Sequence, residues 1–498
     1  MSARTSLALT LFAAATLWTA RAAASPLFEL AGGTSDGGGL APRVTGAGAP
    51  STYFNPALLP HAKQGFSLGV LVLSDHIGIT LDGRGRGDVP DIVGDRELVD
   101  QAGTPISNQT VPTRWLVRGC PGDECKGGGF GARPRQAAGS SGNTRAYQII
   151  GLVNHLAGDR VVLGFYALVP LGTFTTAHAF YNDEREQFFS NSLHPELYSD
   201  RMTATSVSFG GASKLSKQLS IGLSFTLNLK NSADAGTYVR DANDYNQLLL
   251  STKVNVDASV SPHFAINWRP SDVLSLSATV HSKQQLIIDT TFSALLPSGL
   301  ESKTTRRAVH DFVPWTFGGG GELELSRTAN TRLSAVASAS YALWSYYLDR
   351  HGESPATYGS FLKWKNTLSG AAGARYEVGA TRLLGDLSFT PTPVPPQTGR
   401  SNYVDNDKAG VALGVDHTFA VAGIKLRAGV MGQVQTLFRR DQKKVDGQIQ
   451  DELPDDARTR TGQAVPGRAG LQTNNPGWPG FSSQGTILGG AITLAILY

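Results

Sequence analysis

The stretch LSIGLSFTLNLK, Leu219 to Lys230, alternates strictly between apolar residues and residues that are polar or very small. Successive side chains of a β-strand point to opposite faces, so this stretch would form a strand with one continuous apolar face. A soluble β-sandwich shows the same alternation, with its polar face turned toward water. The stretch therefore predicts a strand, and its surroundings must show whether the apolar face meets a protein core or lipid.

About fourteen segments of this kind follow one another from residue 65 to the end of the chain. We expect strands near residues 65–79, 145–154, 161–174, 201–213, 218–230, 253–268, 273–287, 308–325, 331–346, 367–378, 381–389, 408–419, 424–438 and 486–498. An even number of strands is typical of a single-chain bacterial barrel.

The connections between these segments are short and long in alternation. The short ones are HLAGD, KLSK, RPSD, SRTAN, GA and AVAG, and the others are long and polar. Short turns on one rim and long loops on the other are typical of outer-membrane barrels. The last strand also ends on an aromatic residue, Tyr498. The sequence thus predicts an all-β fold, a transmembrane antiparallel up-and-down barrel in the bacterial outer membrane.

The first 24 residues predict a secretory signal peptide. Arg4 precedes an apolar run over residues 7–20, and small residues at Ala22 and Ala24 form a cleavage site before Ser25. The alternative is an uncleaved membrane anchor, but the run is short for a span. We expect residues 1–24 to be the signal peptide, 25–64 a separate N-terminal segment and 65–498 the barrel.

Composition excludes several classes of protein. The 498 residues carry a net charge of only +4 without a basic stripe, so we expect no nucleic-acid partner. Cys120 and Cys125 in CPGDEC predict a local disulfide in an oxidising compartment, because a zinc site would need further ligands nearby. We expect a monomer without cofactor or metal.

The segment 25–64 carries seven glycines and five prolines and has no sustained period of two. A barrel of about fourteen strands leaves a lumen wide enough to hold such an irregular segment. Backbone groups away from lipid can be satisfied there by the polar inner wall. We therefore expect this segment to be a plug, or hatch, inside the barrel.

The stretch GGGLAPRVTGAGAPSTYFNPALLP, residues 37–60, resembles the hatch of the FadL/TodX family of outer-membrane transporters. The turn Asn55-Pro56-Ala57 is its most specific part, and YALWSYYLD, KWKNTLSGAAGARYEVG and FVPWTFGGGGELEL resemble later strands of that family. The resemblance implies a fourteen-strand barrel that transports long-chain fatty acids or other hydrophobic compounds, with outer-membrane lipid as a partner. It implies capture outside, passage to a lumen pocket and lateral exit at a strand kink.

The resemblance places the kink in the third strand, VVLGFYALVPLGTF. Pro170 has no N–H for the strand ladder, and Gly172 permits a bend. The alternative is a strand that ends at Pro170. Pro314 in FVPWTF is a second position of this type.

Ligand contacts are implied in the same way. Lys365 and, to within one residue, Lys230 match basic lumen positions, and both face inward by strand parity. Phe28 and Leu30 resemble hatch residues that reach the ligand pocket. The alternative for the lysines is pairing with acidic residues such as Glu29.

Capture is the point of departure from the family. The segment after the fifth strand is short and polar here, so we expect first capture at the loop FSALLPSGLES, through Phe292, Leu295 and Leu296.

Two other functions compete with transport of apolar molecules. A general diffusion porin for small polar solutes is the stronger one, although a porin needs no N-terminal plug. An outer-membrane hydrolase could assemble Ser, His and Asp across strands, but the sequence has no H-E-x-x-H, G-x-S-x-G or phosphate-loop motif. We expect the protein not to be an enzyme.

Overall fold

The computed structural model describes residues 27–46, 48–82, 98–99, 138–156, 160–172, 194–195, 205–228, 232–240, 247–257, 260–295, 301–348, 363–449, 458–459, 475 and 477–498. Across these ranges, no helix has both the length and the apolar character needed to cross a membrane.

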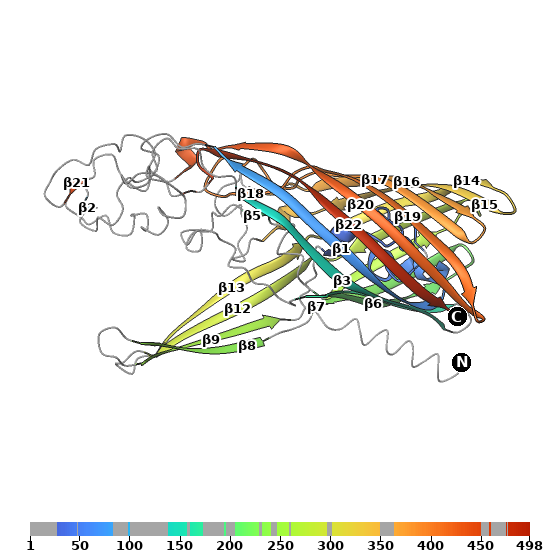
Figure 1. The fold of residues 1–498 in the computed structure, drawn as a ribbon, viewed down its shortest axis with the longest axis horizontal. Helices are drawn as coiled ribbons and strands as arrows, with labels where there is room; N and C mark the ends of the chain where they lie inside the picture. Colours follow the sequence, from blue (N-terminus) through green and yellow to red (C-terminus); the bar gives the residue numbers. More distant parts are fainter. Residues whose placement is uncertain are drawn as a thin grey trace.

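Fourteen antiparallel strands in the described part of the chain close into one barrel (Figure 1). Neighbours in the barrel follow chain order, and the first strand closes against the last with Gly65 opposite Leu497. The strands are β1 (Gly65–Leu81), β3 (Ala138–Leu156), β4 (Val161–Pro170), β6 (Ser206–Lys214), β7 (Leu219–Asn228), β10 (Val260–Trp268), β11 (Leu274–His281), β14 (Thr316–Arg327), β15 (Thr331–Ala342), β16 (Thr367–Val378), β17 (Thr381–Thr390), β19 (Lys408–Val421), β20 (Ile424–Lys443) and β22 (Gly480–Leu497). The predicted fold class and number of strands are confirmed.

The apolar faces of the strands point outward. In β7, the serine, glycine and threonine residues from Ser220 to Thr226 are buried, whereas the alternate apolar residues are partly exposed. Leu413 and Ile492 are 67% and 64% exposed, although they are large apolar side chains. A closed barrel with an apolar exterior has no sheet edge to leave unpaired in lipid. The protein is therefore an outer-membrane β-barrel.

A second, four-stranded sheet bends away from the barrel on the long-loop side (Figure 1). Its order is β13-β12-β9-β8, and its strands are β8 (Ser232–Arg240), β9 (Gln247–Asp257), β12 (Gln284–Leu295) and β13 (Glu301–Val313).

Because of this second sheet, the predicted bounds of three strands are wrong. Residues 253–268, 273–287 and 308–325 each divide between a barrel strand and a strand of the second sheet. In the last case the break falls at Pro314, which has no N–H to continue the ladder. The alternation continues through all three breaks because both sheets are built from strands, so periodicity alone could not locate them.

The third barrel strand is also shorter than predicted. It ends at Pro170 and not near residue 174. β4 pairs with β3 as far as Pro170, but with β6 only as far as Leu168. Gly172 lies in an exposed bend just beyond the strand.

Two small sheets lie among the long connections. β5 (His194–Pro195) pairs in parallel with β18 (Tyr403–Val404), and β2 (Leu98–Val99) pairs with β21 (Arg458–Thr459). Two 3₁₀ turns, η5 (Trp344–Tyr346) and η8 (Asp446–Gln448), follow β15 and β20.

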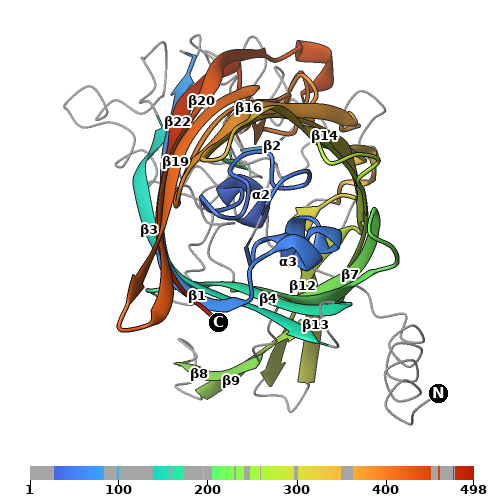
Figure 2. The same cartoon turned by 90° about the vertical axis from the view of Figure 1, so that its right-hand side faces the viewer.

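The N-terminal segment lies inside the barrel, as the view along the axis shows (Figure 2). It forms α2 (Leu27–Ala31), α3 (Ser51–Phe54) and the 3₁₀ helix η2 (Pro56–His61). Most of its described residues are buried. We call residues 27–62 the hatch.

Candidate ligand cavity above the hatch

The Asn55-Pro56-Ala57 turn holds two distant parts of the hatch together. The Asn55 side chain accepts a hydrogen bond from the Ala57 N–H at 3.1 Å and donates one to the carbonyl oxygen of Arg43 at 2.6 Å. Pro56 begins η2, where a missing N–H costs no helical hydrogen bond. Both hydrogen bonds are buried, so the turn fixes the position of Arg43 as well as its own.

The same turn sits directly on the barrel wall. The Ser220 hydroxyl of β7 donates to the Ala57 carbonyl at 2.7 Å. Two residues along the strand, a Cβ on Gly222 would lie 2.4 Å from the Pro56 carbonyl carbon. Only glycine permits this close approach of two backbones. Ser220 and Gly222, two of the small residues of the Leu219–Lys230 stretch, therefore form a surface on which the hatch packs.

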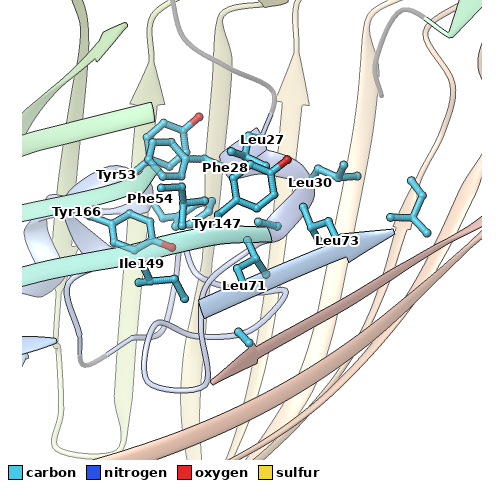
Figure 3. Close-up of a cluster of buried hydrophobic side chains, with 14 of the residues drawn as sticks. Leu27, Phe28, Leu30, Tyr53, Phe54, Leu71, Leu73, Tyr147, Ile149 and Tyr166 are labelled. Carbon is cyan, nitrogen blue, oxygen red and sulfur yellow. The ribbon is translucent and has the colours of Figure 1, made fainter. Parts of the chain in front are cut away.

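Apolar packing holds the hatch against one side of the lumen (Figure 3). The Phe28 ring lies 4.5 Å from Tyr53 and 5.2 Å from Tyr166 of β4, measured between centroids. Leu71 and Leu73 of β1 join the same buried cluster. Here the inner wall is apolar, because it faces the hatch and not water.

Charged groups hold the hatch against β16, β17 and β20. Arg427 of β20 donates to Asp36 at 2.7 Å. Asp386 of β17 accepts from the Leu40 N–H at 2.9 Å and from Arg375 of β16 at 2.6 Å. These buried wall charges are paired and hydrogen-bonded, as buried charges must be. The hatch thus contacts the barrel wall at several strands, from β4 and β7 to β17 and β20.

Buried Arg43 and the more accessible Glu29 form an ion pair at the upper surface of the hatch. The Glu29 carboxylate accepts from Arg43 Nη2 at 2.6 Å and from the Tyr53 hydroxyl at 2.8 Å. Burial by itself raises the pKa of Glu29, but the Arg43 charge and the two hydrogen bonds together lower the pKa below its usual value. The carboxylate is therefore ionised, and the pair is neutral as a unit.

A cavity of about 200 Å³ lies directly above this pair. It occupies the long-loop ends of β14 to β17, between the hatch and the loops. Its lining consists of Glu29, Gly32, Leu40, Pro42, Arg43, Phe54, Val313, Pro314, Thr316, Ser338, Ser340, Ala342, Trp344, Thr367, Ser369, Gly370, Ala371, Ser388, Thr390 and Gln435.

An aromatic cluster adjoins the outer end of the cavity, and Trp344 belongs to both. Tyr347 stacks on Trp364 with ring centroids 3.6 Å apart, and Trp344 lies 5.5 Å from Trp364. Phe312 and Tyr403 complete the cluster from β13 and β18. These residues were not among the predicted site residues, although the aromatic-rich stretches YALWSYYLD, KWKNTLSG and FVPWTF carry most of them.

The ladders of β11, β14, β15 and β16 end in the same row beside the same cavity. β14 pairs with β15 up to Thr316 opposite Ala342, and one further hydrogen bond joins the Leu343 N–H to the Trp315 carbonyl at 2.9 Å. Beyond it, β13 pairs only with β12 among the described residues. We call this place, residues 313–315 facing residues 342–344, the Pro314 seam.

The remaining predicted site residues lie elsewhere or outside the described ranges. Lys365 is exposed before β16, its N–H donates to the Pro393 carbonyl at 2.8 Å, and it does not line the cavity. Phe28 and Leu30 lie in the buried apolar cluster, whereas their neighbour Glu29 reaches the cavity. Lys230, Leu296, Cys120 and Cys125 are outside the described residues. The roles predicted for all of these stay predictions.

The expected capture loop is largely strand. Phe292 and Leu295 belong to β12, opposite Thr304 and Glu301 of β13. For these strand residues the prediction of a loop is wrong, because the ladder of the second sheet continues through them. Residues 296–300 lie outside the described part of the chain, and the predicted capture role stays a prediction. Separately, no group of three His, Cys, Asp or Glu side chains among the described residues could hold a metal ion.

The architecture is similar to that of solved structures. A FadL homologue of Pseudomonas aeruginosa matches with a TM-score of 0.53 at 15% identity, over 95% of this chain and 99% of that one. The fold is that of a FadL homologue. The Pseudomonas putida toluene transporter TodX is also similar, with a TM-score of 0.47 at 11% identity over 94% of this chain and 98% of that one. No protein-family model and no curated protein matches the sequence.

Proposed function

We propose that this FadL-like barrel carries small hydrophobic molecules across the outer membrane by way of the cavity above the hatch. One observation supports the proposal: the hatch lies in the lumen beneath the cavity, and the β14–β15 ladder ends beside the cavity at Pro314. In this proposal a solute leaves the cavity sideways into the bilayer, because the hatch obstructs the axial path below.

The energetics favour such a side route for apolar solutes. Release into water costs roughly 0.8 kcal/mol for each CH₂ that loses its burial. Release into lipid avoids this cost. Trp315 and Tyr341 are exposed on the outer surface next to the seam. Aromatic residues collect at the membrane interface, so we infer that the seam opens toward lipid at that level.

Of the two candidate exits, Pro170 and Pro314, the geometry favours Pro314. Pro170 ends β4, and β11, β10, β7 and β6 lie between β4 and β14 in the barrel order. Pro170 does not line the cavity, whereas Pro314 does. We propose Pro314, the second of the two positions that the sequence indicated, as the lateral opening. The aromatic cluster around Trp344 would then be the outer gate.

The test compares two variants on opposite faces of one strand. Ser340→Phe fills the cavity, whereas Ala339→Phe places the same ring on the lipid face of β15. We expect Ser340→Phe to abolish barrel-dependent uptake of radiolabelled toluene by cells, and Ala339→Phe to behave as wild type. Heat-modifiable migration in gels confirms that both variants fold. Equal uptake by all three proteins would overturn the role of the cavity.

A second measurement distinguishes transport of hydrophobic molecules from the rival function, that of a general diffusion porin. A general diffusion porin would let liposomes swell rapidly with small sugars, and a barrel closed by the hatch would not. Swelling at porin-like rates by the wild-type protein would support the porin and overturn the proposal.

A further inference from the structure

The wall of the cavity is unusually rich in hydroxyl groups for a site that takes apolar molecules. The inward positions of β15, β16 and β17 recur every second residue, and in each strand two of them are serine or threonine. With one residue from β14, the cavity is lined by seven hydroxyl side chains: Thr316, Ser338, Ser340, Thr367, Ser369, Ser388 and Thr390. The residues between them, such as Leu368 and Phe389, are large and exposed on the lipid side.

These hydroxyls are available to a ligand. Thr316 donates to the Pro314 carbonyl at 3.2 Å. Within the described residues, the other six have no hydrogen-bond partner in the protein. A hydroxyl group can donate one hydrogen bond and accept two, and it rotates to suit its partner. In the unliganded cavity these groups bind water, and a ligand that displaces the water must replace its hydrogen bonds or lose affinity.

The cavity carries no net charge. Among the described residues that line it, only Glu29 and Arg43 are ionisable, and they pair at 2.6 Å. An ionised carboxylate ligand would therefore enter without a free counter-charge, which is costly in a partly dry site.

Size and shape limit the ligand further. A cavity of about 150 Å³ is enough to hold benzene, and this one is about 200 Å³. Phe54 and Trp344 supply aromatic surface at its floor and outer end. The space fits a single ring with short substituents, and it does not enclose a long alkyl chain.

We propose that the cavity selects uncharged, oxygen-bearing molecules of one ring, such as an aromatic alcohol, phenol or ketone, over hydrocarbons of the same size and over carboxylates. The proposal rests on the transport function proposed above and adds the substrate class. The ring packs against Phe54 and Trp344, and the oxygen exchanges hydrogen bonds with the serine and threonine wall. A hydrocarbon would leave those hydroxyls unpaired, which is how polar sites reject analogues lacking the polar group.

The test measures binding of benzyl alcohol, toluene and benzoate by equilibrium dialysis against protein-free micelles of the same detergent. The variant is Ser338→Ala, Ser340→Ala and Ser369→Ala combined, and the control is Ser326→Ala at the other end of β14. We expect wild type and control to bind benzyl alcohol roughly tenfold more tightly than toluene, the effect of one or two net hydrogen bonds. The triple variant should lose that preference, and benzoate should bind to none of the proteins.

Several results would overturn the proposal. These are equal wild-type affinities for benzyl alcohol and toluene, a preference that survives in the triple variant, or tight binding of benzoate. If the triple variant does not fold, Ser369→Ala alone must shift the ratio in the same direction. Barrel-dependent toluene uptake that is blocked by Ser340→Phe, together with equal affinities, would refute the substrate class but keep the transport function. Absence of barrel-dependent uptake of both toluene and benzyl alcohol would refute the transport function itself.

Discussion

The Asn55 side chain donates a buried hydrogen bond to the Arg43 carbonyl at 2.6 Å, and Arg43 forms the floor of the ligand cavity with Glu29. This hydrogen bond therefore connects the turn that packs on β7 to Arg43, whose charge faces the cavity. A change that loosens the turn should alter the fit of the hatch in the lumen and leave the barrel folded, because the described barrel strands form their ladders with one another.

Asn55→Ala should loosen the hatch and leave the barrel folded. The Arg43 carbonyl and the Ala57 N–H would lose buried partners, at a cost of about 1–3 kcal/mol. We expect amide hydrogen exchange in the hatch to accelerate and planar-bilayer conductance to rise. Asn330→Ala, in an exposed turn after β14, is the matched control. Unchanged conductance together with unchanged exchange would show that Asn55 does not hold the hatch closed.

Pro314→Ala should slow uptake of apolar compounds several-fold. Alanine restores an N–H at the break between β13 and β14, which favours a continuous ladder beside β15. Pro170→Ala makes the same chemical change at the end of β4 and should leave uptake at the wild-type rate. The measurement is the initial uptake rate of radiolabelled toluene in cells with matched amounts of folded barrel. The reverse pattern would place the lateral opening at the third strand.

Acidification should open the hatch through His61, at the end of η2. Burial, together with the nearby positive charges of Arg269 and Lys214, lowers the pKa of His61 to about 3 from its ordinary value of 6.5. The closed hatch therefore favours neutral imidazole, and its stability is present above pH 6.5 and lost as the pH falls from 6.5 toward 3.

We expect wild-type conductance to rise as the pH is lowered from 7 to 4, and His61→Gln to show a much flatter profile. Glutamine keeps a polar side chain of similar length but cannot titrate in this range. Identical profiles for the two proteins would mean that another group controls the response.

The sequence predicted the barrel because its signals are local. Alternation along Leu219–Lys230 is a property of neighbouring residues, and the Asn55-Pro56-Ala57 turn consists of three consecutive residues. The same locality explains the errors. The sequence shows that Pro314 and Pro170 can each interrupt a strand ladder. Only the strand pairing in the structure shows that the chain before Pro314, β13, belongs to the second sheet, and that β4 ends at Pro170.

By itself, the sequence determined the all-β class, the number of barrel strands and an irregular segment too poor in apolar residues to fold alone. Tertiary structure decided where a ligand can lie. Ser338, Ser369 and Ser388 meet in one cavity only because β15, β16 and β17 are neighbours in the closed barrel. Asp36 and Arg427 are 391 residues apart and pair at 2.7 Å only when the hatch is in the lumen. Periodicity indicates on which face of its strand a residue lies. The closure of the barrel around the hatch decides which strands are neighbours and which inward residues contact the hatch.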